Sequence, residues 1–303
     1  MTIISDSIYF HDRFAIKYHD NTFVASGYID YAGQVQIDGQ AVFKDLSAFN
    51  GQIFIERMGG RGNGTFKAAG NLLNPDIIGQ FESDSVWFYD ILSRQATANF
   101  DIKHFLYDRE GSADARLLDG MLYDVPYDTI LLLMTVDSQF VLIDSGFVSN
   151  EYANMTGFGV LDYLSYPQHL TVDGFQIDVM GLHLSNSSPV TVDIDSAGYD
   201  FTNCRLERPI GSVEGNGRID YDETMDFQVK VDRIDIVPWM RLYSDEYELS
   251  GLLSGRAQIL GNFESPIIEF DGRVDSLQYQ KLVLGDLLAK FRYSDVRVGI
   301  DSV

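Results

Sequence analysis

Along most of the chain, apolar and polar side chains alternate with a period of two. The alternation is clearest over 96–102, 190–195, 227–232 and 296–301, where every second residue is apolar. Successive side chains of a β-strand point to opposite faces of the sheet. The pattern therefore predicts an all-β protein whose strands have one apolar face and one polar face.

Short polar segments separate these predicted strands. They contain the residues that favour tight turns, as in HDN at 19–21, YAG at 31–33, SNSSP at 185–189 and YDET at 221–224. Helical periodicity is scarce. We expect only a few short helices, at Asp45–Phe49 and Asp235–Tyr243, each beginning with an aspartate able to cap it.

An internal repeat relates two parts of the chain, at approximately 27–102 and 217–293. The copies share, in the same order, GYIDY and GRIDY, a short helix that begins with Asp, a glycine-rich strand and a proline turn. A third, partial copy of the first motif is GVLDY at 159–163. Such self-similarity at a fixed offset indicates repetition of one supersecondary unit.

Two architectures are compatible with the repeat: duplication of a globular β-domain, or an elongated sheet that grows strand by strand. No linker or change of composition separates the copies. The intervening residues 103–216 read as amphipathic strands of the same kind. We therefore expect 1–303 to form one continuous, elongated β-repeat segment.

Charge and cysteine content exclude several classes of function. The net charge of −23 disfavours binding to nucleic acid or to an anionic membrane surface. The single cysteine, Cys204, excludes a disulfide within the chain. The longest apolar run, at 130–134, is far shorter than the roughly 20 residues of a membrane-spanning helix, and the first residues do not read as a signal peptide. The chain ends in a strand-like pattern, so we expect a segment of a longer protein.

Motifs for catalysis or metal binding are missing. Neither G-x-S-x-G nor H-E-x-x-H occurs, and no two histidines have metal-ligand spacing. The segment 193–198 resembles the start of a calcium loop, but Ala197 occupies its third ligand position. Cys204 stands beside Arg205, which lowers a thiol pKa only where the two side chains meet. We expect no catalytic residue, no metal and no cofactor.

The repeated segments resemble a known family. GTFKAAGNLLNPDIIGQF at 64–81 and GRAQILGNFESPIIEFDGRV at 255–274 are similar to a signature of the TamB and AsmA-like proteins: a glycine, a strand, Gly-Asn, a turn with proline, and a further strand. The segments 117–163 and 275–295 resemble neighbouring units of that family. The resemblance covers nearly the whole chain.

The resemblance implies a trough-like β-groove: a long, strongly curved sheet with an apolar interior. It also implies a segment of a periplasm-spanning protein that carries phospholipid between the inner and outer membranes of a diderm bacterium. TamB itself partners TamA, an outer-membrane barrel, so a TamA-like barrel is an expected partner of the full-length protein. The membrane anchor of the family is not recognisable in this segment.

The apolar positions of the predicted strands are the candidate groove lining. Acyl chains gain about 0.8 kcal/mol for each CH₂ removed from water, so a continuous apolar lane holds a lipid tail. The candidates are Val35, Ile37, Phe43, Ala98, Phe100, Ile102, Leu132, Met134, Phe175, Ile177, Val192, Ile194, Phe227, Val229, Val231, Ile268, Phe270 and Val298. The expected structural turns contain Gly70, Pro75, Gly261 and Pro266.

Two other classes of function stay open at this point. The first is a structural or adhesive β-solenoid of the cell surface, whose interior side chains meet and leave no room for a ligand. The second is a carbohydrate-active enzyme on a β-solenoid, which requires buried carboxylates in a cleft. An open apolar surface distinguishes the lipid conduit from both.

Overall fold

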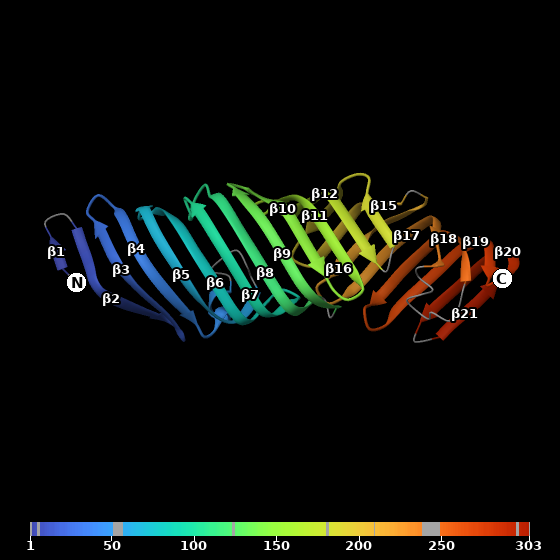
Figure 1. Ribbon diagram of the computed structural model, residues 1–303, viewed down its shortest axis with the longest axis horizontal. Coiled ribbons are helices and arrows are strands. Elements are labelled where there is room, and N and C mark those ends of the chain that lie inside the picture. The colour runs from blue at the N-terminus through green and yellow to red at the C-terminus, as the bar shows by residue number, and fades with distance from the viewer. Residues whose placement is uncertain are drawn as a thin grey trace. The chain divides into compact units, whose positions relative to one another are not determined.

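The computed structural model describes residues 2–4, 7–50, 57–122, 125–179, 182–208, 210–237, 249–294 and 297–302. The chain divides into two units, Met1–Thr156 (unit 1) and Gly157–Val303 (unit 2). In each unit, antiparallel strands pair in the order in which they follow along the chain (Figure 1). The prediction of an all-β fold is confirmed.

Unit 1 contains strands of up to 15 residues. They are β1 (Thr2–Ile4), β2 (Ser7–Tyr18), β3 (Asn21–Asp30), β4 (Gln34–Phe43), β5 (Met58–Asn71), β6 (Asn74–Phe88), β7 (Ile91–Lys103), β8 (Glu110–Leu122), β9 (Val125–Asp137) and β10 (Phe140–Ser149). Strand β11 (Ala153–Asp162) includes the boundary between the units.

Unit 2 continues with a similar series. Its strands are β12 (Gln168–Val179), β13 (Leu182–Asn186), β14 (Val190–Ile194), β15 (Gly198–Glu207), β16 (Ser212–Asp220), β17 (Thr224–Asp235), β18 (Leu249–Asn262), β19 (Pro266–Tyr279), β20 (Leu282–Ser294) and β21 (Arg297–Ser302). Strands β13 and β14 lie end to end, because both are antiparallel to β12 and to β15. Asn186 fills the break between them: its Oδ1 accepts from Phe175 N at 2.6 Å and its Nδ2 donates to Asp173 O at 3.1 Å.

Both expected helix starts have the cap that the sequence predicts. The first helix is a single 3₁₀ turn, η1 (Leu46–Phe49), and Asp45 Oδ1 accepts from Ser47 N at 2.9 Å. At the second, Asp235 Oδ1 accepts from Val237 N at 3.0 Å, and residues 238–243 lie outside the described part of the chain. Among the described residues, no helix has both the length and the hydropathy needed to cross a membrane.

The two repeat copies have the same strand order and the same register. Strands β3–β7 of unit 1 correspond to β16–β20 of unit 2. Ile37 opposes Ala68 as Phe227 opposes Ile259. The same correspondence holds for the other opposed pairs away from the bulges. Near the bulges the copies differ, since Val86 opposes Ser93 whereas its counterpart Leu277 opposes Gly285.

A line of irregularities crosses the strands of unit 1 near one end. The register of β5 and β6 shifts by one residue between Arg61 and Asn63. In β7, burial alternates over 96–102 in one phase and over 91–93 in the other, and in β8 Asp119 has a left-handed φ of 51°. Such bulges bend a strand and change the face to which the following side chains point. Apolar residues on both sides of the line therefore stay on one face of the sheet.

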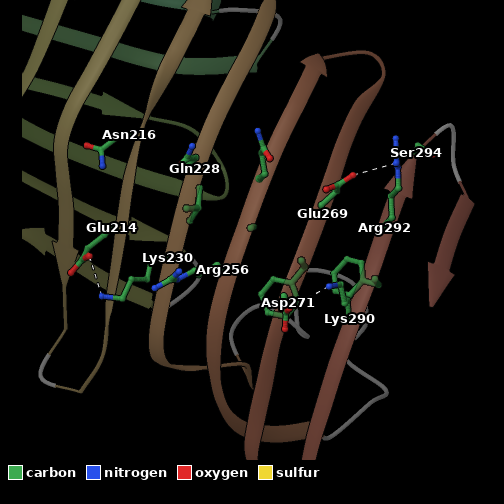
Figure 2. A pocket seen from close by; sticks show the side chains of 15 residues that line it. Glu214, Asn216, Gln228, Lys230, Arg256, Glu269, Asp271, Lys290, Arg292 and Ser294 are labelled. Carbon is green, nitrogen blue, oxygen red and sulfur yellow. Dashed lines mark hydrogen bonds and ion pairs between the residues drawn. The ribbon is translucent and has the colours of Figure 1, made fainter. Parts of the chain in front are cut away.

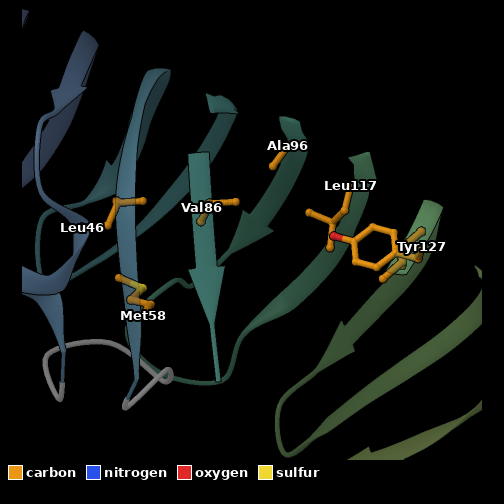
Figure 3. Close-up of a cluster of buried hydrophobic side chains, with 7 residues drawn as sticks. Leu46, Met58, Val86, Ala96, Leu117 and Tyr127 are labelled. Atoms are coloured by element: carbon orange, nitrogen blue, oxygen red, sulfur yellow. The ribbon is translucent and has the colours of Figure 1, made fainter. Parts of the chain in front are cut away.

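The core of unit 1 sits at this line. Leu46 of η1 and the strand-end residues Met58 and Val86 belong to one buried cluster, together with Leu117 and Tyr127 (Figure 3). Residues from beyond the bulges thus pack against residues that precede them. The bend in the sheet and the η1 turn therefore enclose this core together.

Two polar side chains hold the bend in place. Ser93 is only 1% exposed, and its hydroxyl donates to Gln95 O at 2.7 Å or to Leu118 O at 3.0 Å. The Tyr127 hydroxyl donates to Leu92 O at 2.9 Å, and burial raises the pKa of this tyrosine. These hydrogen bonds satisfy backbone carbonyls near positions where the ladder is irregular.

Candidate functional site

The strand register of unit 1 arranges apolar side chains in continuous rows. Residues directly opposite one another in neighbouring antiparallel strands share a face of the sheet. The central row crosses β3–β10 through Ala25, Gly39, Phe66, Gly79, Phe100, Ala113, Met134 and Ile143. Every position in this row is apolar or glycine.

Two further rows flank the central one. The first contains Gly27, Ile37, Ala68, Ile77, Ile102, Gly111, Val136 and Val141. The second contains Phe23, Ala41, Gly64, Phe81, Ala98, Ala115, Leu132 and Gly146. We refer to these three rows together as the unit 1 apolar face.

Phenylalanine rings in these rows lie across glycines of the neighbouring strands. A methyl group at Gly39 would lie 2.3 Å from Phe66 Cζ, and one at Gly79 would lie 2.4 Å from Phe100 Cζ. The rings thus occupy the space directly above these glycines instead of projecting from the sheet. Phe66 and Phe100 therefore lie flat against the sheet.

Solvent exposure varies over the unit 1 apolar face. Next to the bulge line, Ala96, Leu117 and Ile130 are each 5% exposed and belong to the core. Farther along the strands, Phe100 and Met134 are only partly buried, whereas Ile102 is again buried. Water therefore reaches part of the apolar rows on this unit.

Unit 2 has an equivalent apolar face. One row contains Leu170, Val192, Phe201, Gly217, Phe227, Ile259, Ile268 and Tyr293. The next contains Cys204, Gly215, Val229, Ala257, Phe270 and Phe291. These two rows form the unit 2 apolar face, on which most side chains are again only partly buried.

The predicted lining residues fall into these rows or extend them. Val35 opposes Gly70 and Phe43 opposes Gly62, each one step beyond a row. The remaining predicted positions of unit 1 are members of the rows: Ile37, Ala98, Phe100, Ile102, Leu132 and Met134.

In unit 2 the predicted positions Val192, Phe227, Val229, Ile268 and Phe270 are members of the rows. Ile194 and Val231 extend them, opposing Tyr199 and Gly255. Phe175 and Ile177 follow the break that Asn186 fills, where Ile177 opposes the buried Leu184. The backbone of Val298 opposes that of Tyr293, but its side chain lies outside the described part of the structure.

Sequence reasoning missed several members of the rows. The predicted lining does not include Phe23, Phe66, Ile77 and Phe81, although they stand at the same two-residue spacing as their neighbours. The repeat carries the signal that identifies one of them, because Ile77 is the counterpart in the first copy of the predicted lining residue Ile268.

The predicted turn residues form equivalent hairpins in the two copies. Gly70 (φ 93°) opposes Pro75, and Gly261 (φ 92°) opposes Pro266. After each glycine, an asparagine caps the turn: Asn71 Oδ1 accepts from Leu73 N at 2.9 Å, and the asparagine of the second copy accepts from Ser265 N at 2.7 Å. The positive φ explains why glycine stands at both positions.

The opposite face of unit 2 is polar and hollowed. A hollow of about 1010 Å³ lies between β16 and β20. Charged and amide side chains line it, together with Val229, Ala257, Phe270 and Phe291 of the unit 2 apolar face (Figure 2). Its ion pairs join neighbouring strands, as between Lys230 and Glu214 (3.3 Å) or between Arg292 and Glu269 (3.2 Å).

Two hollows of unit 1, of about 460 and 870 Å³, have mixed linings, the first including Phe66 of the central row beside Asp38 and Lys67. None of these three hollows is lined by apolar side chains alone.

In the segment that resembles a calcium loop, Asp195 is bound by the side chain of Arg218. Asp195 accepts from Arg218 Nη2 at 2.9 Å and from the backbone N–H groups of Ala197 and Gly198 at 2.7 and 2.8 Å. Hydrogen bonds from Arg218 are the main reason that the pKa of Asp195 lies well below its usual range. The described residues contain no group of three His, Cys, Asp or Glu side chains arranged to hold a metal ion.

Cys204 has no features of a reactive thiol. Its side chain is partly buried in the unit 2 apolar face, and burial raises its pKa. The guanidinium of Arg205 turns instead to Glu207 at 2.6 Å and to Glu214. Residue 204 therefore contributes a small apolar side chain to its row.

Comparisons with known proteins give no match. No protein family, curated protein or solved structure matches this chain. What the chain binds is therefore inferred from the chemistry of its two faces.

Proposed function

We propose that the apolar faces of the two units bind the acyl chains of phospholipids. The observation that carries this proposal is the set of unbroken apolar rows across β3–β10, which remain partly exposed beyond the core. Soluble proteins rarely expose contiguous apolar patches of more than a few hundred Å², and larger patches mark ligand grooves or interfaces. The absence of polar side chains from these rows suits a hydrocarbon ligand.

The rows also suit movement of the ligand. Neighbouring strands are about 4.8 Å apart, so eight strands give a lane of roughly 34 Å. Each methylene that leaves water contributes about 0.8 kcal/mol, and this contribution is nearly the same at every point of an apolar lane. A lipid tail therefore moves from strand to strand without crossing a large barrier.

We further propose that the apolar face is the inner surface of an elongated trough. The bulge line supports this arrangement, because it bends the strands toward the apolar side and brings Met58 and Val86 into one cluster with Leu117. The polar face, with its ion pairs and the net charge of −23, then faces water.

This proposal places the chain with bridge-like lipid-transfer proteins of the TamB and AsmA-like kind. The chain acts without catalysis, as a segment in the periplasm of a diderm bacterium, and contributes to outer-membrane biogenesis. Its ligand is phospholipid, and a TamA-like barrel is a partner of the full-length protein. The support is the repeated Gly-Asn-turn-Pro hairpin, whose register is the same in both copies.

A structural or adhesive β-solenoid is the second candidate. It is favoured by the rings of Phe66 and Phe100, which cover the glycines of neighbouring strands with the protein's own side chains. In a solenoid such filling completes a packed interior. The two functions differ in whether the apolar face takes up lipid.

The test is native mass spectrometry of the purified chain, with extraction and analysis of bound lipid. We expect co-purified phospholipid in the wild type and its loss in Ala98→Asp, which places a charge on the apolar face. Thr97→Asp is the matched control, because this neighbouring residue is exposed on the polar face of the same strand. Circular dichroism verifies that both variants fold.

Photo-crosslinking provides a readout that does not depend on a buried charge. A benzophenone amino acid at Phe100 is expected to crosslink to phospholipid, and the same group at Thr97 is not. A folded, lipid-free protein with no crosslink at either position would contradict lipid binding and favour the solenoid.

A further inference from the structure

The large hollow of unit 2 has a duplicate in unit 1, and the two hollows differ in their side chains. The unit 2 hollow, of about 1010 Å³, crosses β16–β20, and the unit 1 hollow of about 460 Å³ crosses β3–β6. Of the residues that line the unit 1 hollow, all except Ala25 have their repeat counterpart in the lining of the unit 2 hollow. The comparison therefore separates what the backbone provides from what the side chains add.

Four side chains from two neighbouring strands stand at the centre of the unit 2 hollow. Lys230 of β17 directly opposes Arg256 of β18, and Figure 2 shows the two cationic side chains beside each other. In the next polar row, Gln228 opposes Gln258. We call these four residues the basic square. Like charges that oppose each other across two strands destabilise a sheet, so the pair of cations has a cost in stability.

The unit 2 hollow has one more cation than its carboxylates can pair. Each of the three carboxylates in its lining already has a cationic partner, in the pairs Glu214–Lys230 (3.3 Å), Asp271–Lys290 (3.6 Å) and Glu269–Arg292 (3.2 Å). The fourth cation is Arg256, whose guanidinium has no ion pair or hydrogen bond within the described part of the chain. This surplus stands in a chain whose net charge is −23.

The equivalent positions of unit 1 show that the hollow does not require these charges. Gln40 is the counterpart of Lys230, and Thr65 is the counterpart of Arg256. In the described lining of the unit 1 hollow, the charged side chains are Asp38 and Lys67, which pair with each other at 3.5 Å. The surplus cation is therefore a property of unit 2 that the repeat does not explain.

We propose that the basic square binds an oligosaccharide that carries one acidic group. The guanidinium of Arg256 presents a fork of donors that matches a carboxylate, and the ammonium of Lys230 adds a second charge. The amides of Gln228 and Gln258 both donate and accept hydrogen bonds, as sugar hydroxyls do. A small inorganic anion only accepts hydrogen bonds, and it fills little of a hollow of about 1010 Å³.

The surroundings of the basic square disfavour other classes of ligand. The carboxylates of the lining repel a polyanion, so nucleic acid, which binds through many phosphates, is disfavoured. A protein interface has an apolar centre from which charged residues are depleted, whereas the centre of this hollow is charged. One negative charge among neutral hydroxyl groups matches the single surplus cation.

Binding at the basic square is separate from acyl-chain binding. Lys230 and Arg256 alternate along their strands with Val229 and Ala257 of the unit 2 apolar face, so they stand on the opposite face of the sheet. The inference therefore does not rest on the proposed function.

The test is a titration of the whole chain with sialyllactose, followed by the NMR signals of the sugar. Sialyllactose is a lactose unit that carries one carboxylate, and lactose is its neutral counterpart. We expect saturable binding of sialyllactose and at least tenfold weaker binding of lactose. Inorganic phosphate and glycerol phosphate, the polar part of a phospholipid, are titrated in the same way and are also expected to bind at least tenfold more weakly.

A pair of double variants assigns the binding to the hollow. Lys230→Gln/Arg256→Gln should weaken binding of sialyllactose at least tenfold. The matched control is Arg273→Gln/Lys281→Gln, which removes the same charge from exposed positions of unit 2 outside the lining of the hollow and should leave binding unchanged. Removing two like charges that oppose each other should not impair folding, and circular dichroism verifies this for both variants.

Three outcomes would overturn the proposal. They are no saturable binding of sialyllactose, binding of lactose as tight as that of sialyllactose, and equal weakening in the two double variants. Binding of inorganic phosphate or glycerol phosphate as tight as that of sialyllactose would show a site for any oxyanion and would overturn the assignment to carbohydrate. Lys230→Gln/Arg256→Gln should retain co-purified phospholipid, so failure here is distinguishable from failure of the proposed function.

Discussion

The two copies of the repeat share their buried core positions and hairpin turns, but differ in the side chains on their surfaces. Leu46 and Val86 are each 7% exposed in unit 1, and their counterparts Ile236 and Leu277 are 8% and 7% exposed in unit 2. The hairpin glycines and the helix-capping aspartates also correspond. The duplicated features are thus those that bend the sheet and anchor its core.

The differences lie on the two faces and at the tips. Rings lie over glycines in both units, as Phe100 does over Gly79 and Phe270 over Gly255, but in unit 2 Phe270 also stacks on Phe291 with ring centroids 5.2 Å apart. Ion pairs run across β16–β20 on the polar face of unit 2, and its tips at 221–223 and 263–265 add Asp222, Glu223 and Glu264, where the corresponding tips of unit 1 at 31–33 and 72–74 have no carboxylate. The same frame therefore supports two different surfaces, which points to separate roles for the units.

Core substitutions are expected to cause the largest loss in the free energy of unfolding. Each should affect only the unit that contains it. Leu277→Ala removes a buried side chain at the bend of unit 2 and should lower the free energy of unfolding by about 2–5 kcal/mol. Hydrogen exchange followed by mass spectrometry should show faster exchange in unit 2 peptides and little change in unit 1. Val86→Ala should produce the reverse pattern.

The control for this comparison is Leu288→Ala, since Leu288 is 67% exposed. Its effect should stay within about 0.5 kcal/mol. If Leu277→Ala accelerates exchange equally in both units, the division into two units is wrong as a description of stability.

Filling a glycine beneath a ring should come next in size. In Gly79→Ala the new methyl group would lie 2.4 Å from Phe100 Cζ and 2.9 Å from Thr65 O, so the ring must lift from the sheet. We expect a loss of about 1–3 kcal/mol, as for other overpacked positions. Chemical denaturation measures it.

Gly215→Ala in unit 2 is the matched control. The nearest atom to a methyl group there is Gln228 O, at 3.9 Å. It should be neutral or slightly stabilising, because alanine restricts the unfolded chain more than glycine does. Equal losses in the two variants would show that the ring of Phe100 above Gly79 is not the cause of the loss.

The strands and their faces could be predicted from the sequence because alternation is a local property. Ala98 and Phe100 reveal their face through their own neighbours in the chain. The predicted caps at Asp45 and Asp235 are local in the same way, since each aspartate accepts from the residue two positions later.

Features that depend on distant residues could not be predicted. The bulge line is visible in sequence only as broken alternation, and its result, the contact of Val86 with residues of other strands, needs the register. The segment around Asp195 has the composition of a calcium loop, yet its partner is Arg218, 23 residues away. That four hairpins of unit 1 turn at the same end of the sheet likewise follows only from the register.

Alanine substitution of the hairpin glycines should lower thermal stability by a smaller amount. It tests whether the two copies have the same turn geometry. Gly70→Ala meets no atom within 4 Å, so its cost is the backbone strain of a positive φ, about 1 kcal/mol. Gly261→Ala has the same strain and also brings a methyl group within 2.7 Å of Ser265 O. The loss in thermal stability should therefore be greater at Gly261, and the reverse order would contradict the shared turn geometry.

The smallest expected effect is a dependence on pH that differs between the units. In unit 2, Arg218 contacts Asp195, Asp200 and Asp220, whereas Tyr28 stands at the equivalent position of unit 1, where Arg61 contacts Asp84 elsewhere on the sheet. These side chains are at least 28% exposed, so each contact is screened by solvent.

The sign of the pH effect follows from the direction of the pKa shift. The pKa of Asp195 in the folded chain lies below its value of about 3.9 in an unfolded chain, because Arg218 stabilises the carboxylate. The stabilisation is complete above that pH and is lost as the pH falls through the folded pKa. Unit 2 should therefore lose stability progressively below about pH 4, as measured by its denaturation midpoint or by hydrogen exchange corrected for pH.

Arg218→Gln should remove most of this acid sensitivity, because the carboxylates then no longer titrate against a cation. Arg61→Gln should change the acid response of unit 1 less, since a single exposed pair is lost, although Arg61 also lowers the pKa of Asp84. An unchanged acid response in Arg218→Gln would show that other carboxylates govern it, and that the arginine in the calcium-like segment does not distinguish the two copies.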